Sequence, residues 1–294
     1  MIRKPNFFIV GAPKCGTTAL SEYLRAHPRI FFSEPKEPHY FNFDFINRHT
    51  KNIDTYMDYF AGANDSHVAV GEGSVFYLRS EVAIPEILKF NPEAKFIVMI
   101  RNPLEAVYSF HSEALFSLGE LERDFTAAWN LQNDRQAGHN IPAIHPEPKV
   151  YLYGELFQIG AQLERLYALV VKDRIKIIVF DDFKSNPDSV YQETLAFLGI
   201  ENDGRNYFPI INDNKRFKSK RLGRITAGLY QLKSRLGLSN VRLGLLARIA
   251  SGNISRSKRD PLPAELRVRL IEYFSTDVKK LSSLIERDLS HWLV

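Results

Sequence analysis

The stretch FFIVGAPKCGTTAL, residues Phe7–Leu20, decides the fold of this chain. An apolar run leads into a turn with two glycines, and helix-forming residues follow, which predicts a buried strand, a phosphate-binding loop and a helix. The spacing Gly11-x-x-x-x-Gly16 matches the triphosphate loop G-x-x-x-x-G-K-[ST], yet Thr17 occupies the lysine position. The lysine lies inside the turn, at Lys14. The loop is therefore either a triphosphate loop without its lysine or an intact loop for another anion.

Four short runs are apolar on both faces, as expected of parallel strands buried in a sheet. They are Phe7–Gly11, His67–Glu72, Lys95–Arg101 and Lys176–Asp181. Helical patterns cover Thr17–His27, Ser80–Phe90, Pro103–Leu118, Leu152–Val171 and Pro263–Arg287. The alternation predicts an α/β fold with a P-loop-like central parallel sheet flanked by helices. Because no linker, repeat or low-complexity tract interrupts it, we expect residues 1–294 to form a single domain.

The composition is that of a globular protein, with 45% hydrophobic and 25% charged residues over a length that can bury a large core. A single cysteine, Cys15, excludes an internal disulfide framework and a cysteine-based zinc cluster, and favours a reducing compartment. The N-terminus lacks the pattern of a signal peptide, and no apolar run approaches the ~20 residues that span a bilayer. We therefore expect a cytoplasmic protein without a metal site.

The basic residues are concentrated in one segment. Residues 215–259 hold 13 of the 39 Lys and Arg and none of the 34 Asp and Glu, which leaves 26 basic against 34 acidic residues elsewhere. We expect helices and loops here, at about 215–260, within the same domain. The pattern is typical of a helix with a basic solvent side, of peripheral contact with an anionic membrane, and of a wall facing an acidic partner. Nucleic acid is not an expected partner, because aromatic residues are few and no binding motif is present.

The loop carries the groups that bind a phosphate without a metal. A turn before a helix presents backbone N–H groups and the positive end of the helix dipole, and Gly11 and Gly16 let an anion approach closely. Thr17 and Thr18 add hydroxyl donors, and Lys14 adds a mobile positive charge. The alternative is a plain strand-to-helix turn that contains two glycines.

A second strand–helix junction, KFIVMIRNPLEAVYSFHSEAL (Lys95–Leu115), offers a second anion site. Arg101 ends the strand at the carboxyl edge of the sheet, where ligands of open α/β folds bind, and Ser109 lies two turns into the next helix. A guanidinium and a hydroxyl placed there can hold another phosphate. The alternative is that Arg101 caps or pairs with a neighbour.

Together, GAPKCGTTAL and IRNPLEAVYSFH, about 85 residues apart, resemble the two donor-binding motifs of sulfotransferases that use 3′-phosphoadenosine 5′-phosphosulfate. The resemblance is to bacterial and heparan-sulfate-type members and runs nearly the full length of the chain. Three further segments are similar to that family: SEPKEPHYF (Ser33–Phe41), GEGSVFYL (Gly71–Leu78) and RDLSHWL (Arg287–Leu293). It implies in-line transfer of a sulfuryl group to a hydroxyl, or secondarily an amine, of a carbohydrate, lipid or small metabolite.

The resemblance also assigns donor-binding roles. Lys14 would contact the oxygen that bridges sulfur and phosphorus and stabilise charge on the leaving group. Arg101 and Ser109 would bind the 3′-phosphate, while Lys218 and Ser219 in a late basic loop would close over the nucleotide. The complete donor-binding set is Pro13, Lys14, Cys15, Gly16, Thr17, Thr18, Arg101, Ser109, Lys218 and Ser219. The product would be adenosine 3′,5′-bisphosphate, and no metal is required.

A general base is expected because the acceptor loses a proton as it attacks. The resemblance favours Glu37, with His39 as the alternative base or as an orienting partner. Spacing does not choose between them, since residues i and i+2 of an extended segment point to the same side.

The acceptor side is predicted from GEGSVFYL, whose candidate residues are Glu72, Ser74 and Tyr77. Packing of Tyr77 into the core is the alternative. Some glycan-modifying relatives carry a catalytic lysine where this chain has Gly73, which argues against a heparan-like acceptor site.

Two other functions stay open from the residues alone. A P-loop kinase of small molecules would need a Mg²⁺–triphosphate site, and Thr17 argues against one. A non-catalytic nucleotide- or membrane-binding protein of the same fold would not need Lys14, Arg101, Ser109 and Glu37 all to be present. We therefore expect a sulfotransferase.

Overall fold

The computed structural model describes residues 2–46, 48–117, 119–143, 145–211 and 260–294, together with the backbone of residues 215–217 and 254–256. Its central sheet has five parallel strands in the order β2-β3-β1-β4-β5. Their bounds are β1 (Phe7–Gly11), β2 (Ile30–Phe32), β3 (Ala69–Gly73), β4 (Lys95–Ile100) and β5 (Ile175–Val179). The predicted fold class is confirmed.

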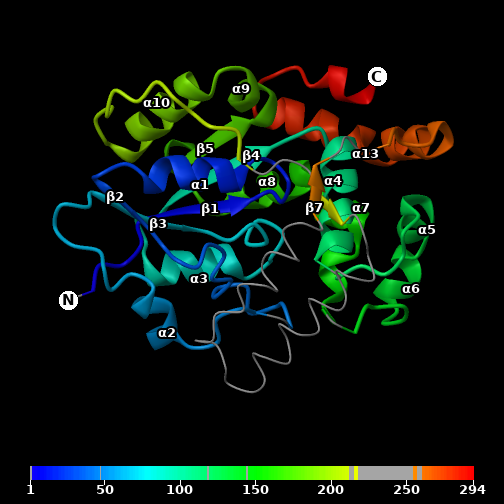
Figure 1. Ribbon diagram of the computed structural model, residues 1–294, viewed down its shortest axis with the longest axis horizontal. Helices are drawn as coiled ribbons and strands as arrows, with labels where there is room; N and C mark the ends of the chain where they lie inside the picture. Colours follow the sequence, from blue (N-terminus) through cyan, green and yellow to red (C-terminus); the bar gives the residue numbers. More distant parts are fainter. Residues whose placement is uncertain are drawn as a thin grey trace.

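Helices flank this sheet, with α1, α9 and α10 gathered on one side of it in the view of Figure 1 and α2 and α3 on the other. The helices are α1 (Thr17–Arg25), α2 (Ile53–Asp58), α3 (Ala83–Phe90), α4 (Pro103–Phe116), α5 (Phe125–Asn130), α6 (Gln132–Gln136), α7 (Tyr153–Leu156), α8 (Ile159–Leu169), α9 (Phe180–Ser185), α10 (Pro187–Leu198) and α13 (Ala264–Leu284). Short 3-10 turns lie at Pro148–Val150, Lys172–Arg174 and Ser290–Leu293.

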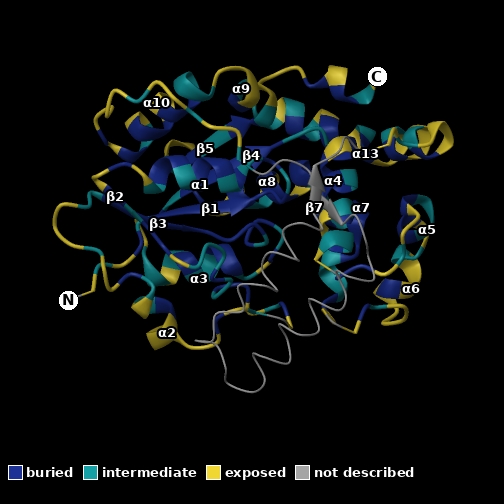
Figure 2. Ribbon diagram, in the orientation of Figure 1, coloured by how far each residue is buried: buried dark blue, intermediate teal, exposed yellow. Residues whose placement is uncertain are grey.

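The core is built around the middle strand, β1. All five residues of β1 and of β3 are buried, as Figure 2 shows for the centre of the molecule, because helices cover both faces of a parallel sheet. Phe7 pairs in register with Gly71, and a Cβ at Gly71 would lie 2.2 Å from the Phe7 ring. Gly71 thus leaves the space into which the Phe7 ring packs.

The structure differs from the predicted elements in several places, and helices α2, α5, α6, α9 and α10 were not predicted. Strand β2 was not predicted, because its three residues are too few to show a pattern. The predicted helix Leu152–Val171 is broken into α7 and α8. The carboxylate of Asp277, on α13, accepts hydrogen bonds from the N–H groups of Gly160 and Ala161, both at 2.8 Å. This cap at the start of α8 comes from a residue more than 110 positions away, so local sequence does not reveal it.

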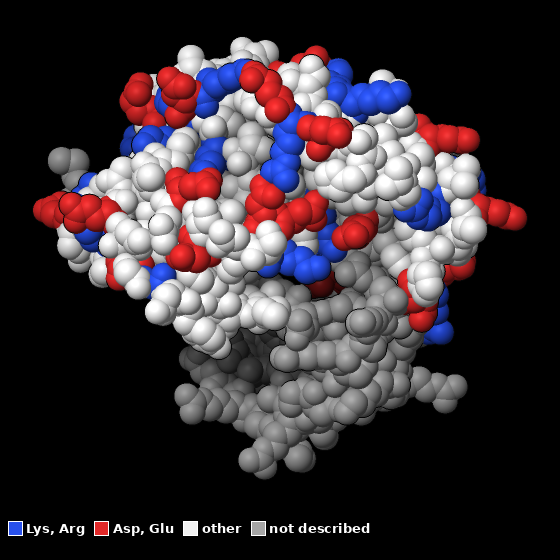
Figure 3. All heavy atoms as spheres, turned by 90° about the horizontal axis from the view of Figure 1, so that it is seen from above, with Lys and Arg blue, Asp and Glu red and all other residues white. Residues whose placement is uncertain are grey.

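Most of the basic segment predicted at about 215–260 lies outside the described residues, including Lys218 and Ser219. Within it, β6 (Lys215–Phe217) pairs antiparallel with β7 (Ile254–Arg256), so the expectation of helices and loops is wrong for these residues. On the face shown in Figure 3, Lys and Arg are interspersed with Asp and Glu over the described surface. Among the described helices, none combines the length and apolar character that a bilayer span requires.

Candidate active site

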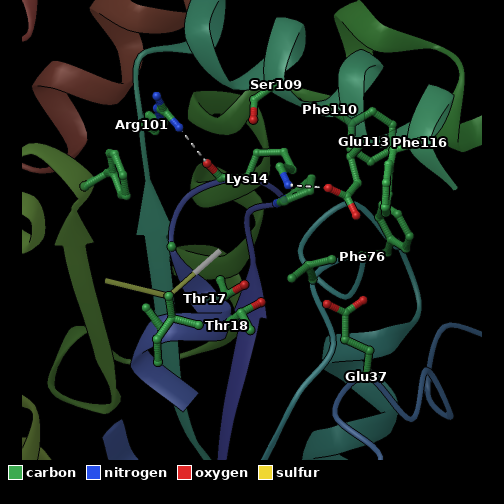
Figure 4. A pocket seen from close by; sticks show the side chains of 16 residues that line it. Lys14, Thr17, Thr18, Glu37, Phe76, Arg101, Ser109, Phe110, Glu113 and Phe116 are labelled. Atoms are coloured by element: carbon green, nitrogen blue, oxygen red, sulfur yellow. Dashed lines mark hydrogen bonds and ion pairs between the residues drawn. The ribbon is translucent and has the colours of Figure 1, made fainter. Parts of the chain in front are cut away.

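A cavity of about 370 Å³ lies where β1 and β4 end, and Figure 4 shows the side chains that line it. The lining residues are Pro13, Lys14, Gly16, Thr17, Thr18, Ala19, Glu37, Val75, Phe76, Arg101, Ser109, Phe110, Glu113, Phe116, Phe180 and Ile211. Eight of them were predicted as site residues: Pro13, Lys14, Gly16, Thr17, Thr18, Glu37, Arg101 and Ser109. The two sequence motifs therefore converge on one cavity, as the position of strand ends in parallel sheets predicts.

The loop after β1 is curled by two residues in the left-handed region, Lys14 at φ 62° and Gly16 at φ 91°. Glycine suits the second position, because a Cβ there would lie 3.1 Å from the ring of Phe180 in addition to the unfavourable φ. Gly16 offers no side chain to cap α1, which begins at Thr17. The first N–H groups of α1 therefore face the loop as anion-binding donors.

Arg101 is fixed in place directly after β4. Its Nη1 donates to the carbonyl oxygen of Lys14 at 3.3 Å, and its Nε and Nη2 donate to one carboxylate oxygen of Glu105 at 3.1 and 2.6 Å. The guanidinium also stacks over Phe180, 4.4 Å from the ring centroid. Ser109, on α4, lines the same cavity. A guanidinium held this firmly is preorganised to bind an anion.

Lys14 points across the cavity to a carboxylate that sequence reasoning missed. Its Nζ lies 3.1 Å from Oε2 of Glu113, an ion pair drawn as a dashed line in Figure 4. Glu113 is four residues after Ser109 on α4, so both lie on one helix face. That helical spacing was the available signal, because Ser109 was already predicted to face the ligand.

Glu37 lines the cavity, whereas His39 does not. Nε2 of His39 lies 3.1 Å from one carboxylate oxygen of Glu37, and Nζ of Lys36 donates to the other at 2.8 Å. Burial raises the pKa of Glu37, but the hydrogen bonds and charges of His39 and Lys36 outweigh it and hold the pKa at about 2. His39 stacks on Phe76 with ring centroids 5.2 Å apart. The geometry favours Glu37 as the base and His39 as its orienting partner.

The segment around Glu37 was expected to be extended, but its backbone is not extended in the structure. Glu37 and His39 have φ values of 65° and 48°, in the left-handed region, so the rule for alternate residues of a strand does not apply. Both side chains are brought together by a tight turn of the backbone.

The predicted acceptor-side residues lie beneath the cavity and do not line it. Glu72, Ser74 and Tyr77 are fully buried. Ser74 Oγ donates to Glu72 at 2.7 Å and accepts from the backbone N–H of His39 at 3.0 Å. The hydroxyl of Tyr77 accepts from the N–H groups of Tyr40 and Phe41, at 2.9 and 3.2 Å. Direct contact with the acceptor is therefore corrected to a supporting role, because these buried side chains hold the loop that carries Glu37.

Burial also sets the protonation of two predicted residues. It raises the pKa of Glu72 to about 7 against the hydrogen bonds from Ser74, Tyr77 and Tyr56. It raises the pKa of the Cys15 thiol to about 12, and the thiol donates to the carbonyl of Pro13 at 3.4 Å. Cys15 does not line the cavity, so the structure does not bring its thiol to the predicted donor site.

At Gly73, where some glycan-modifying relatives carry a lysine, another lysine lies close by. A Cβ at Gly73 would be 3.6 Å from Cε of Lys36. The side chain of Lys36 thus passes close to Gly73, and its ammonium pairs with the carboxylate of the next residue, Glu37, at 2.8 Å. Among the described residues, no group of three or more His, Cys, Asp or Glu side chains is arranged to hold a metal ion.

Comparison with known proteins identifies, over most of the chain, the family that the sequence motifs resemble. The family model of the sulfotransferase domain matches residues 4–226. Carbohydrate sulfotransferase 15 of Mus musculus is 33% identical over 250 residues, which cover 67% of this chain and 44% of that protein. The bifunctional heparan sulfate N-deacetylase/N-sulfotransferase 2 of Bos taurus is 27% identical, over 97% of this chain and 30% of that protein. The chain thus spans less than half the length of these two relatives.

A solved structure agrees in fold over the whole length. The sulfotransferase from Alicyclobacillus acidocaldarius is 27% identical and superposes with a TM-score of 0.73, covering 99% of both chains. The chain therefore belongs to the sulfotransferase family, and its domain is that of a transferase.

Proposed function

We propose that this chain transfers the sulfuryl group of 3′-phosphoadenosine 5′-phosphosulfate to a hydroxyl of a carbohydrate, lipid or small-metabolite acceptor. One observation carries the proposal: a single cavity joins the anion-binding loop of Lys14, the guanidinium of Arg101 and the carboxylate of Glu37. Cationic groups lie at one end of this cavity and a carboxylate lies at the other, as transfer from an anionic donor to a hydroxyl requires. The names of the relatives support a carbohydrate acceptor and keep an amine as the second option.

Donor binding follows from the two motifs. Thr17, Thr18 and the first N–H groups of α1 would hold the 5′-phosphate. Arg101 and Ser109 would hold the 3′-phosphate, with Arg101 already immobilised by Glu105. Because these groups are placed before the donor arrives, little of their conformational entropy is lost on binding.

The chemical step needs a base, an in-line attack and a stabilised leaving group. The acceptor oxygen attacks sulfur, the bond from sulfur to the bridging oxygen breaks, and its electron pair goes to the phosphate of adenosine 3′,5′-bisphosphate. Lys14 is placed to stabilise that charge. Glu37, with its pKa of about 2, is ionised at neutral pH and thus in the form that accepts the acceptor proton.

Calorimetry without metal tests the proposal against a P-loop kinase. We expect adenosine 3′,5′-bisphosphate to bind in the presence of a chelator, and ATP with Mg²⁺ to bind weakly or not at all. The kinase becomes the better reading if ATP with Mg²⁺ binds more tightly than the bisphosphate. Radiolabelled donor then tests turnover, since a non-catalytic binding protein would hold the bisphosphate without releasing labelled sulfate to any acceptor.

A further inference from the structure

The side of the cavity away from Arg101 has a chemistry of its own. Figure 4 shows the rings of Phe76, Phe110 and Phe116 with the carboxylates of Glu37 and Glu113 on that side. We call these five residues the acceptor end. The rings of Phe76 and Phe110 meet edge to face, with centroids 6.3 Å apart. The acceptor end thus combines an aromatic wall with two negative charges.

Glu113 lies within this aromatic wall rather than beside it. Phe110 and Phe116 are three residues before and three after Glu113 on α4, so all three lie on one helix face. The side chain of Glu113 is 55% exposed, and it lines the cavity. A molecule that fills the acceptor end therefore meets this carboxylate.

Lys14, the ion-pair partner of Glu113, is also the proposed leaving-group stabiliser. In the proposed function Lys14 moves its charge to the bridging oxygen of the donor, and the ion pair with Glu113 at 3.1 Å is then weakened or lost. Arg101, the other cation among the described cavity residues, is held by Glu105 and by the Lys14 carbonyl. A carboxylate left without its cation in a partly enclosed site gains from a new hydrogen-bond donor or cation.

We propose that Glu113 is a specificity-determining residue that accepts a hydrogen bond or an ion pair from the acceptor. The acceptor end thereby selects alcohols or phenols with an aromatic or apolar body and a neutral or cationic substituent. It discriminates against acidic acceptors such as uronic-acid-rich glycans, because an anion would lie against two carboxylates. This inference rests on the proposed function and narrows its acceptor class.

The aromatic wall also favours neutral or cationic acceptors over acidic ones. Phenyl rings in offset or edge arrangements pack against a planar acceptor, and a cation over a ring face is attracted by its quadrupole. Neither interaction favours a carboxylate or a sulfate. The ring of Phe76 also stacks on His39, so the wall continues directly to the pair that contains the proposed base.

Three phenols with matched side chains test the inference. Tyramine, tyrosol and 3-(4-hydroxyphenyl)propanoate share the nucleophile and a two-carbon arm that ends in an ammonium, a hydroxyl or a carboxylate. We expect wild-type kcat/KM with labelled donor to be at least about 10-fold higher for tyramine than for the propanoate, with tyrosol between them. Glu113→Gln should lower this ratio clearly, because only the carboxylate of Glu37 then remains, and Glu113→Lys should invert it.

The control is Glu193→Gln. Glu193 forms an ion pair with Lys176 at the same 3.1 Å, its side chain is 61% exposed, and it lies outside the cavity. This variant should keep both the wild-type ratio and the wild-type rate. Because the readout is a ratio within each variant, a general loss of activity does not imitate the expected result.

Three results overturn the inference while leaving the proposed function in place. They are a wild-type preference for the propanoate, a ratio unchanged by Glu113→Gln, and no transfer to any of the three phenols. Each counts only if calorimetry shows that adenosine 3′,5′-bisphosphate binds the same preparation. If that bisphosphate does not bind, the proposed function itself fails, so the two failures are distinguishable.

Discussion

The two ends of the cavity are built from different parts of the fold. The donor end, made by the loop after β1 and the junction of β4 with α4, extends from the middle strand of the sheet and its neighbour. The acceptor end comes from the segment after β2, the segment after β3 and one face of α4. The first is anchored at strand ends, while the second depends on contacts between distant loops.

This difference explains what each end can do. Groups fixed at strand ends are preorganised, as stabilisation of a developing charge requires. The acceptor end is held by hydrogen bonds between distant residues, from the N–H of His39 to Ser74 and from the N–H groups of Tyr40 and Phe41 to Tyr77. We therefore expect substitutions in these loops to change acceptor specificity without changing donor binding. The four variants below test this separation.

Glu37→Gln should have the largest effect. Removing a general base costs about 10²–10⁴-fold in rate, whereas binding of adenosine 3′,5′-bisphosphate at the donor end should be unchanged. Single-turnover transfer and calorimetry measure the two quantities. His39→Asn should lose less, because the ring only orients Glu37. Retained activity in Glu37→Gln would transfer the base role to His39 or to another group.

Lys14→Ala should come next, because Lys14 contacts both ends. We expect kcat to fall by about 10²–10³-fold, with less than a 10-fold change in affinity for the bisphosphate, since leaving-group charge grows mainly in the transition state. Lys176→Ala, which breaks the Lys176–Glu193 pair at the same distance, is the matched control. Equal losses of kcat and of affinity would make Lys14 a ground-state clamp.

Arg101→Lys should affect binding at the donor end only. It keeps the charge but loses the fork of donors that now reaches Glu105 and the Lys14 carbonyl. We expect the preference for adenosine 3′,5′-bisphosphate over adenosine 5′-phosphate to fall about 10-fold by calorimetry. Arg269→Lys, on the exposed side of α13, should leave the preference unchanged. If the affinities for both nucleotides fall equally, Arg101 does not bind the 3′-phosphate.

Glu72→Gln should have the smallest effect on transfer, because Glu72 does not line the cavity, and should act on stability instead. Because burial raises the pKa of Glu72 from 4.5 to about 7, the folded protein favours the protonated form. Its contribution to the free energy of unfolding is present below pH 4.5 and is lost as the pH rises to about 7, by at most about 3 kcal/mol. Urea unfolding should show this loss in the wild type and not in the variant. Parallel pH curves would mean that Glu72 is ionised when folded.

The donor end could be predicted from sequence because its chemistry follows the chain. Gly16, Thr17 and Thr18 adjoin one buried strand, and Arg101 ends another, so a strand pattern and a short motif place all four. Four of the five strands of the central sheet were predicted for the same reason. Strand β2 is too short for such a signal, and the break between α7 and α8 depends on Asp277, far along the chain.

The acceptor end could be predicted only in part. Glu37 was found through its resemblance to a family motif, but its left-handed backbone was not, because that turn is imposed by Ser74 and Tyr77. Those two residues were expected to touch the acceptor, since a motif shows which residues matter but not which are buried. Glu113 was missed because one helix residue among many has no motif of its own.

The hydrogen bond from Arg101 to the carbonyl of Lys14 has a consequence for how nucleotides are told apart. It links two predicted anion sites that are 87 residues apart in the chain and helps to fix the distance between them. A fixed distance between the two sites favours a ligand whose two phosphates have the matching separation. Nucleoside 5′-diphosphates carry a similar charge, but their two phosphates are separated differently. We therefore expect such nucleotides to bind weakly whatever base they carry.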